Sequence, residues 1–454
     1  MVAKIYAARW LLPVSSPAVE GGALAIEGAR IVGVGSRQEV FVRFPDAEHE
    51  EFGEAVIVPG LVNCHSHLEL TAMRGYLEDV EDFFLAWLRK LTRARNERLT
   101  PDDLWASAAW GAVEALRAGV TCVGDAGDSG ATTAAALREV GLRGVVFLEV
   151  FGPDPSAAAA QGAKLREKVS RLREAETELV KTGVSPHAPY TVSAPLFELL
   201  TEYALAEKLP VMIHAAESPA EQLFMLEGEG PFAEMLRWRG IEWRAPKIST
   251  IQYLKNLGVL AARPLLAHCV HADDADFAAI SEAGASVAHC PKSNAKLGHG
   301  RASFAAMLRA GLSVGLGSDS VAANNNCDLL EEARFALLAS RAAGDKLAGE
   351  RMVAAEDVLR VATLGGARAL GIEHRVGSLA EGLEADFAVV GLGGAHQQPV
   401  YDPASALVFS SSGRDVLLTV VAGRELFRDG RLNTLDEADL RARTDDLARR
   451  LAEK

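Results

Sequence analysis

The chain has 454 residues, of which 49% are hydrophobic and 24% are charged, and this composition excludes disordered, collagen-like and disulfide-scaffold proteins. Its 61 acidic residues outnumber its 47 lysines and arginines, and the resulting net charge of −14 disfavours nucleic acid and anionic membranes as partners. The five cysteines are scattered and form no CxxC pair, so we expect reduced thiols and a cytoplasmic protein.

The two ends of the chain share a strand-rich pattern. Short alternating segments broken by Gly and Pro fill the first part of the chain, and the same texture returns late. We therefore predict that residues 1–58 and 371–434 together form one small composite β-sandwich domain. Residues 435–454 are charged and amphipathic, which predicts a C-terminal helix.

Residues 59–370 have a different rhythm, in which short β-branched runs alternate with Ala-, Leu-, Glu- and Arg-rich stretches of helical period. This pattern predicts an α/β fold, and eight repeats favour a closed (β/α)8 TIM barrel. An open doubly wound sheet alternates in the same way, but no GxGxxG follows the first strand. The strand-like runs are residues 54–63, 119–125, 144–150, 181–186, 209–214, 263–268, 285–290 and 312–319.

Ionisable residues stand at the end of every one of these runs. In a parallel barrel the carboxyl ends of the strands build the active site, so these side chains are expected to converge. Six of the 11 histidines of the chain fall at these positions. In chain order the positions are His65 and His67, Asp125, Glu149, His187, His214 with Glu217 just beyond it, His268, His289 and Asp319.

Two histidines two residues apart suggest a metal site. His65 and His67 point to the same face of a strand and can bind one ion together, although an HxH pair alone is a weak signal. His214 adds a third nitrogen and Asp319 a carboxylate oxygen. Three histidines and one aspartate suit zinc or ferrous iron and leave room for a water molecule.

Glu217 lies three residues after His214. It can be an acid at the start of a helix, where the dipole favours it, or a proton shuttle beside a metal-activated water, and its neighbour favours the second role. His268 closes an apolar run and is expected to face the site, whereas His271 is expected in a loop or behind the site. His289 fits either the pocket or the core.

The motifs PGLVNCHSHLEL, VMIHAAE, LLAHCVH, SVAHCPKSNAKLG and GLGSDS occur in this order, and together they resemble the amidohydrolase superfamily. The similarity is to its metal-dependent deaminase and chlorohydrolase branch, which includes S-adenosylhomocysteine, aminodeoxyfutalosine, guanine and cytosine deaminases and the atrazine-type hydrolases. The late segment GSLAEGLEADFAVV resembles that family's return into its β-sandwich domain.

The resemblance implies specific roles for these residues. One divalent metal ion is implied, because the fourth strand is not followed by the lysine that binuclear members carry. Zinc is the expected metal, and iron is the alternative. Glu217, His268 and Asp319 match catalytic residues, and His187 matches a histidine that contacts the substrate. The implied metal ligands are His65, His67, His214 and Asp319.

One position departs from the family pattern. Deaminases of adenosine derivatives resemble this chain around FFLAWLRKL but typically carry Glu just before the Trp, where it holds the ribose hydroxyls. This chain has Ala86 before Trp87. We include both residues in the expected substrate site, and we expect S-adenosylhomocysteine and methylthioadenosine to be poor substrates. Aminodeoxyfutalosine is the leading substrate candidate.

The sequence thus predicts a metal-dependent hydrolytic deaminase of an amino-substituted heterocycle, such as a purine nucleoside derivative or a related base. The alternatives are a dechlorinase or cyclic-amide hydrolase of the same superfamily and, more remotely, a non-catalytic relative that binds other molecules. No apolar run reaches the ~18 residues that span a bilayer, and no targeting segment is visible, so we expect no membrane partner. The net negative charge leads us to expect no nucleic-acid partner. A homodimer is compatible with this interpretation.

Overall fold

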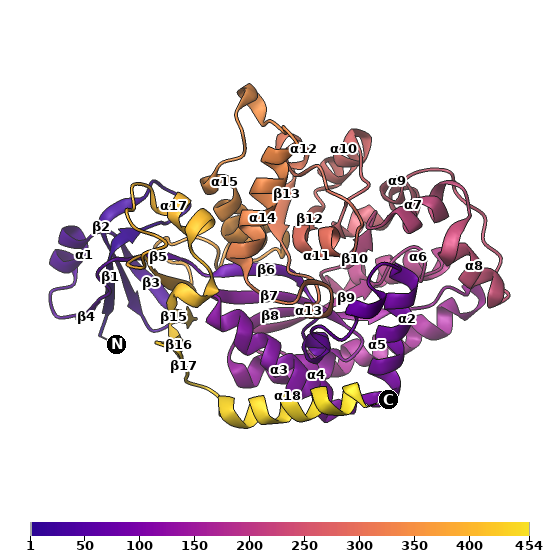
Figure 1. The fold of residues 1–454 in the computed structure, drawn as a ribbon, viewed down its shortest axis with the longest axis horizontal. Coiled ribbons are helices and arrows are strands. Elements are labelled where there is room, and N and C mark those ends of the chain that lie inside the picture. The colour runs from indigo at the N-terminus through magenta and orange to yellow at the C-terminus, as the bar shows by residue number, and fades with distance from the viewer. Residues whose placement is uncertain (1, 454) are drawn as a thin grey trace.

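Strands from both ends of the chain share one sheet in the computed structural model, which describes residues 2–453 (Figure 1). The strand order is β17-β16-β15-β14-β5-β1-β2-β3, and β4 pairs with β1. The hydrogen bonding makes one continuous sheet from both ends of the chain, because β5 pairs with both β1 and β14. These strands are β1 (Lys4–Leu11), β2 (Val19–Glu27), β3 (Arg30–Ser36), β4 (Glu48–Glu51), β5 (Ala55–Pro59), β14 (Phe387–Gly391), β15 (Val416–Val421), β16 (Arg424–Arg428) and β17 (Arg431–Leu432).

The terminal sheet is buried on both faces. Tyr6 of β1 belongs to a buried cluster on one face, and its neighbour Ile5 belongs to a second cluster on the other. This follows from the two-residue period of a strand. Val40 of α1 (Arg37–Arg43) covers the second face, and the side chain of Ser36 caps that helix by accepting a hydrogen bond from the Glu39 amide.

Eight further strands form two parallel sheets in the orders β6-β7-β8-β9 and β10-β11-β12-β13. Isolated bridges join the two sheets at both junctions, from Val184 to Val211 and from Ser66 to Asp319. The chain therefore has an α/β fold with an additional β domain. The strands are β6 (Leu61–Ser66), β7 (Val120–Gly127), β8 (Arg143–Val150), β9 (Val180–Pro186), β10 (Met212–Ala215), β11 (Leu265–His268), β12 (Ser286–His289) and β13 (Ser313–Leu316).

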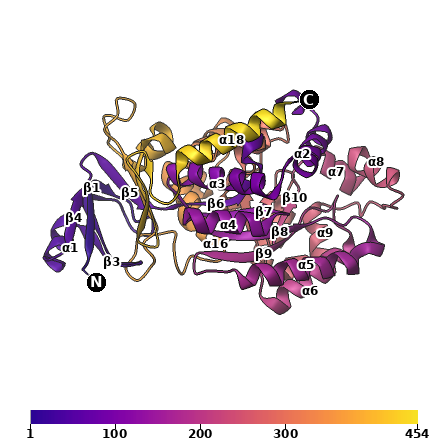
Figure 2. The same ribbon diagram turned by 90° about the horizontal axis from the view of Figure 1, so that it is seen from below.

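Helices separate these strands in sequence, as the helical periods predict, and α3 to α6 lie beside β7 to β9 (Figure 2). No helix within residues 2–453 is long and apolar enough to cross a membrane. The helices are α2 (Phe84–Arg98), α3 (Pro101–Arg117), α4 (Gly130–Val140), α5 (Ala158–Glu174), α6 (Ala194–Glu207), α7 (Pro219–Leu226), α8 (Gly230–Trp238), α9 (Thr250–Asn256), α10 (Asp274–Ala283), α11 (Pro291–Lys296), α12 (Phe304–Arg309), α13 (Val321–Asn324), α14 (Leu329–Ala342), α15 (Ala355–Arg360), α16 (Gly366–Ala369), α17 (Pro403–Ser405) and α18 (Glu437–Ala452).

The C-terminal helix α18 runs back along the molecule beside α3 (Figure 2). Its apolar side buries Leu440, Leu447 and Leu451, which explains its amphipathic sequence. Arg98, the last residue of α2, donates a hydrogen bond to the carbonyl oxygen of Leu451 at 2.8 Å. The end of the chain thus supports the helix that follows the first barrel-type strand.

A buried ion cluster connects β8 to the terminal sheet. Arg143 is 3% exposed, and its guanidinium donates two hydrogen bonds to the Asp386 carboxylate, at 2.8 and 2.9 Å. The same group donates to Glu384 at 2.6 Å. Because each of these charges is removed from water, each depends on the others for compensation.

We predict that Arg143→Met lowers the free energy of unfolding by about 3–5 kcal/mol, because it leaves Asp386 buried without its cation, whereas Glu384 keeps its pair with Arg375. Urea unfolding at neutral pH measures this loss. The control is Arg173→Met, which removes an exposed pair with Glu207 and should change stability by no more than about 0.5 kcal/mol. Equal, small losses in both variants would contradict a structural role for the cluster.

Candidate active site

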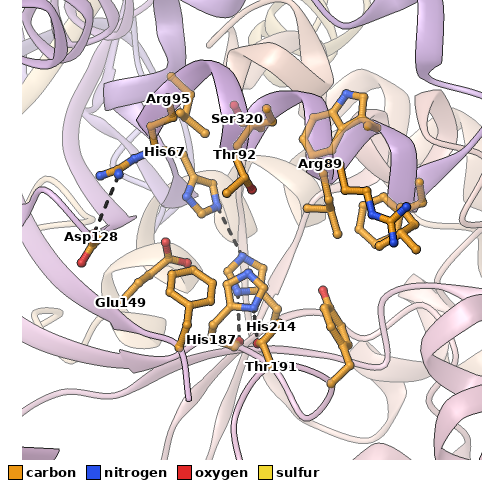
Figure 3. A pocket seen from close by; sticks show the side chains of 18 of the residues that line it. His67, Arg89, Thr92, Arg95, Asp128, Glu149, His187, Thr191, His214 and Ser320 are labelled. Carbon is orange, nitrogen blue, oxygen red and sulfur yellow. Dashed lines mark hydrogen bonds and ion pairs between the residues drawn. The ribbon is translucent and has the colours of Figure 1, made fainter. Parts of the chain in front are cut away.

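A cavity of about 730 Å³ lies at the carboxyl ends of the parallel strands (Figure 3). It brings together most of the ionisable residues that the strand-end pattern singled out. His65 is not among its lining residues, because this side chain is fully buried beneath the cavity. The predicted residues that line it are His67, Trp87, Glu149, His187, His214, Glu217, His268 and Asp319.

Three imidazoles and one carboxylate converge at the floor of this cavity. Asp319 Oδ1 lies 3.4 Å from His65 Nε2 and 3.5 Å from His67 Nε2. His67 Nε2 is 3.3 Å from His214 Nε2, and Figure 3 shows the two rings facing each other. Ligand atoms ~2.0–2.1 Å from a tetrahedral ion are about 3.3–3.4 Å apart, so these separations suit one divalent metal ion.

The protonation states also suit a metal. Burial lowers the pKa of His65 to about 4, although Asp319 opposes this effect, and burial lowers the pKa of His214 well below its ordinary value. Burial alone would raise the pKa of Asp319, but the adjacent His65 imidazole and the charge of His268 outweigh it and hold that pKa far below its usual range. Neutral imidazoles and an ionised carboxylate are the forms that bind metals.

His65 Nε2 is buried and has no hydrogen-bond partner among the described residues. A buried imidazole nitrogen without a partner costs free energy. Because His65 lies beside Asp319 and His67, a metal ion bound among the three side chains would supply that partner. The four side chains therefore fit a divalent metal ion by distance, charge state and the one unpaired nitrogen.

The ends of two strands adopt left-handed backbone conformations that L residues rarely use. The φ angles are 74° at His268 and 57° at Asp319. Such conformations cost about 1–3 kcal/mol each and persist where surrounding contacts impose them. Here the Asp319 amide donates to the His65 carbonyl oxygen at 2.9 Å, and Ser293 Oγ donates to Asp319 Oδ2 at 2.5 Å.

Glu217 stands next to this cluster with two histidines beside it. Its Oε1 atom lies 3.6 Å from His268 Nε2 and 3.5 Å from His299 Nε2. Burial would raise the pKa of Glu217, but His268 and His299 outweigh it and lower that pKa to about 2. Burial likewise would lower the pKa of His268, yet the charges of Glu217 and Asp319 raise it. Glu217 is therefore an ionised carboxylate in this structure.

Several supporting residues were missed by sequence reasoning, which considered only strand ends and their neighbours. Asn294 Oδ1 lies 2.9 Å from His268 Nδ1 and fixes that ring. Both carboxylate oxygens of Glu221 accept hydrogen bonds from the backbone amides of Ala216 and Glu217, at 2.9 and 2.8 Å. These residues, like His299, lie in helices or loops after the strands, where no apolar run marks them.

His187 lines the cavity next to His214. Its Nδ1 atom is 2.8 Å from Thr191 Oγ1, and its ring lies 4.6 Å from the ring of His214 between centroids. Because Nδ1 is occupied by Thr191, the other ring nitrogen is left for a ligand in the cavity.

Helices α2 and α8 supply an apolar outer wall. Trp87 is 6% exposed and lines the cavity, as predicted. Ala86 is not among the lining residues of this cavity in the part of the chain that the structure describes, whereas its helical neighbours Leu85 and Trp87 are. The apolar wall consists of Phe84, Leu85, Trp87, Leu88, Phe232 and Met235.

Besides His65, two of the strand-end residues do not line the cavity. Asp125 is fully buried and accepts a hydrogen bond from the Leu68 amide at 2.6 Å, so it holds the turn after β6. His289 stacks on Phe304 with ring centroids 5.0 Å apart and belongs to the core. His271 lies in a loop, as expected, with Nε2 3.0 Å from the His299 carbonyl oxygen.

Comparisons with known proteins agree on one family. Residues 56–426 match the profile of the amidohydrolase family. A 5-methylthioadenosine/S-adenosylhomocysteine deaminase of Nitratidesulfovibrio vulgaris (strain Miyazaki F) is 34% identical over 441 residues, which cover 96% of this chain and 94% of that relative.

Two solved structures show how far the similarity extends. An adenosine deaminase from Xanthomonas campestris, solved with bound zinc, is 28% identical with a TM-score of 0.87, over 99% of this chain and 98% of the other. An aminofutalosine deaminase of Helicobacter pylori shares the fold, with a TM-score of 0.77 and 21% identity, over 93% of this chain and all of the other.

We predict that purified protein binds about one zinc ion per chain and that His214→Ala reduces this content to near zero, because it removes one of the converging nitrogens. Elemental analysis after dialysis measures the ratio, and removal of the ion by a chelator should lower the Tm. His396→Ala, at an exposed histidine far along the chain, is the control and should keep its metal. Two ions per chain would contradict a single-ion site.

Proposed function

Since this chain belongs to the amidohydrolase family, we propose that it is a metal-dependent hydrolase of carbon–nitrogen bonds other than peptide bonds, which deaminates an amino-substituted, purine-like heterocycle. The observation that carries this proposal is Glu217, which lies beside His268 in the cavity that also holds the converging metal-type ligands. The deaminase names of the relatives support the same reaction.

In this proposal His65, His67, His214 and Asp319 hold the ion, and zinc is the metal we expect. The zinc in the structure of the Xanthomonas campestris relative supports that choice. When bound, the ion supplies Lewis-acid chemistry, which makes water a stronger acid and offsets negative charge that develops near it. The buried, neutral imidazoles leave Asp319 as the only formal charge among the four ligands.

The remaining steps are proton transfers by the chain's own residues. Asp319 and His268 orient the attacking water. Glu217 is ionised at neutral pH, so it accepts the first proton of that water and donates it to the ring nitrogen beside the attacked carbon. The second proton of the water leaves the hydroxyl group of the tetrahedral intermediate and passes through Glu217 to the leaving amine. The balance is one water consumed, one ammonia released and a keto group formed.

His268 has a second role in the proposal. Its Nε2 atom is buried, has no hydrogen-bond partner among the described residues and points toward Glu217. An imidazole N–H in this position can donate to the oxygen of a tetrahedral intermediate, where charge develops. Asn294 holds the ring from the other side through Nδ1, so that His268 needs little reorganisation during the reaction.

The alternative reactions are less well supported. A dechlorinase has no departing amine to protonate, so Glu217 favours deamination over that reaction. A cyclic-amide hydrolase also protonates its leaving nitrogen, and here the deaminase names of the relatives favour deamination. A non-catalytic relative would be expected to lose metal ligands, whereas all four positions are occupied by ligand residues here.

Two observations point to different substrates within the purine-like class. The names of the relatives point to 5-methylthioadenosine and S-adenosylhomocysteine, whereas Ala86 lacks the carboxylate that is expected to hold ribose. The preference for aminodeoxyfutalosine therefore stays a prediction. A comparison of kcat/KM for these three compounds on the zinc-loaded protein decides it.

The architecture that we propose around the site is a closed (β/α)8 barrel over residues 59–370, a composite β domain from residues 1–58 and 371–434, and a terminal helix over residues 435–454. The bridges at both junctions of the two parallel sheets support closure. The five cysteines are buried and free, which supports a reducing, cytoplasmic location. A homodimer is compatible with this proposal.

The proposal predicts that the zinc-loaded protein releases ammonia from at least one compound in a panel of amino-purines, amino-pyrimidines, pterins and their nucleosides. Glu217→Gln should lower that rate about 10²–10⁴-fold, because glutamine keeps the size of the side chain but cannot accept and release a proton as an acid or base. Its zinc content should be unchanged.

The control is Glu234→Gln, which changes an exposed glutamate on α8 and should keep the full rate. A near-normal rate for Glu217→Gln would remove Glu217 from the mechanism. Failure of the metal-loaded protein to release ammonia from any member of the panel would remove the proposed reaction itself.

A further inference from the structure

Glu149, at the end of β8, is a buried acid that the proposed reaction does not use. Its side chain is 8% exposed and lines the cavity. Its Oε1 atom has no hydrogen-bond partner within residues 2–453. Burying a carboxylate oxygen without a donor is costly, so a strand that ends in such a group is arranged for a ligand that supplies the donor.

The nearest cation is already committed to other partners. Arg95 of α2 donates to Glu69 Oε1 at 2.6 Å and to Ser129 Oγ at 2.6 Å, and its remaining arm is 3.8 Å from Asp128. Figure 3 shows Arg95, Asp128 and Glu149 along one side of the cavity, with Arg89 on the other. Burial, followed by the charge of Glu69, raises the pKa of Glu149 well above its ordinary value. Within residues 2–453, Glu149 Oε1 therefore lacks a hydrogen-bond partner.

Glu149 lies where it can contact the substrate, away from the residues proposed to transfer protons. A carboxylate oxygen of Glu149 and one nitrogen each of His187 and His214 all lie within 4.8 Å of one another. Glu217 follows β10 and His268 ends β11, on the side of β9 away from β8, and His187 directly follows β9. A heterocycle whose reacting carbon faces Glu217 therefore directs a ring substituent toward β8.

Resting on the proposed function, we propose that Glu149 is a specificity-determining residue that binds a hydroxyl group of a sugar attached to the heterocycle. A hydroxyl both donates and accepts, so it can pair with a carboxylate or with a carboxylic acid. Position 86 supplies no such partner from α2, and Glu149 offers the acceptor at the end of β8. The site then selects nucleosides over the bare base and over sugars without these hydroxyls.

Binding, rather than turnover, tests this proposal independently of the reaction. The zinc-loaded Glu217→Gln protein is titrated calorimetrically with adenosine and with 2′,3′-dideoxyadenosine, so that neither compound is consumed. We expect adenosine to bind about 10- to 100-fold more tightly, and Glu149→Leu in the same background to reduce this ratio to below about 3-fold. Glu149→Gln, which keeps a carbonyl acceptor, should retain an intermediate ratio.

Asp128→Asn is the matched control, because Asp128 lies at the same wall but is exposed and already paired with Lys168. Asp128→Asn, in the same Glu217→Gln background, should keep the ratio of adenosine to 2′,3′-dideoxyadenosine affinity that is seen when Glu149 is intact. The Tm of Glu149→Leu should not fall, since the carboxylate has no partner to lose, and its zinc content should be unchanged.

Three results would overturn the assignment: no preference for adenosine in the Glu149 protein, an undiminished preference in Glu149→Leu, or loss of zinc from Glu149→Leu, which would make Glu149 a metal ligand. A protein that fails to release ammonia but shows the expected binding ratios would refute the proposed reaction and leave the role of Glu149 standing.

Discussion

Burial of several imidazoles around a single carboxylate is the constraint on which the rest of the site depends. Water is excluded from His65 and His214, so their rings are neutral, and the surrounding histidines keep Asp319 ionised although it is buried. Neither condition is stable for isolated side chains, because an unpaired buried charge and an unpaired imidazole nitrogen both cost free energy. The left-handed backbone at Asp319 persists because this set of contacts imposes it.

The cavity has two chemically different walls that come from distant parts of the chain. The polar wall consists of strand ends, and the apolar wall is carried largely by α2. Trp87 of α2 belongs to the same buried cluster as Leu447 and Leu451 of α18, and Arg98 bonds to the C-terminal end of that helix. The position of the apolar wall therefore depends on the last helix of the chain, far from the metal-type ligands in sequence.

Sequence reasoning succeeded where periodicity determines the structure and failed where the path of a loop determines it. Strand ends can be located from the alternation of apolar runs and helices, so the convergence of His67, His214 and Asp319 could be predicted. The same rule also included Asp125, which holds a turn instead, because whether a strand-end side chain enters the cavity depends on local backbone geometry. His299 was missed because it reaches Glu217 from a loop, and no periodic pattern fixes the path of a loop.

The central claim is that His65, His67, His214 and Asp319 form one metal site. Its most direct test is a crystal of the zinc-loaded protein with diffraction data collected on both sides of the zinc absorption edge. We expect one strong anomalous peak per chain, within about 2.0–2.2 Å of a nitrogen of each histidine and of an Asp319 oxygen. A peak between Glu149, His187 and His214 instead, two peaks in the cavity, or none would contradict the account.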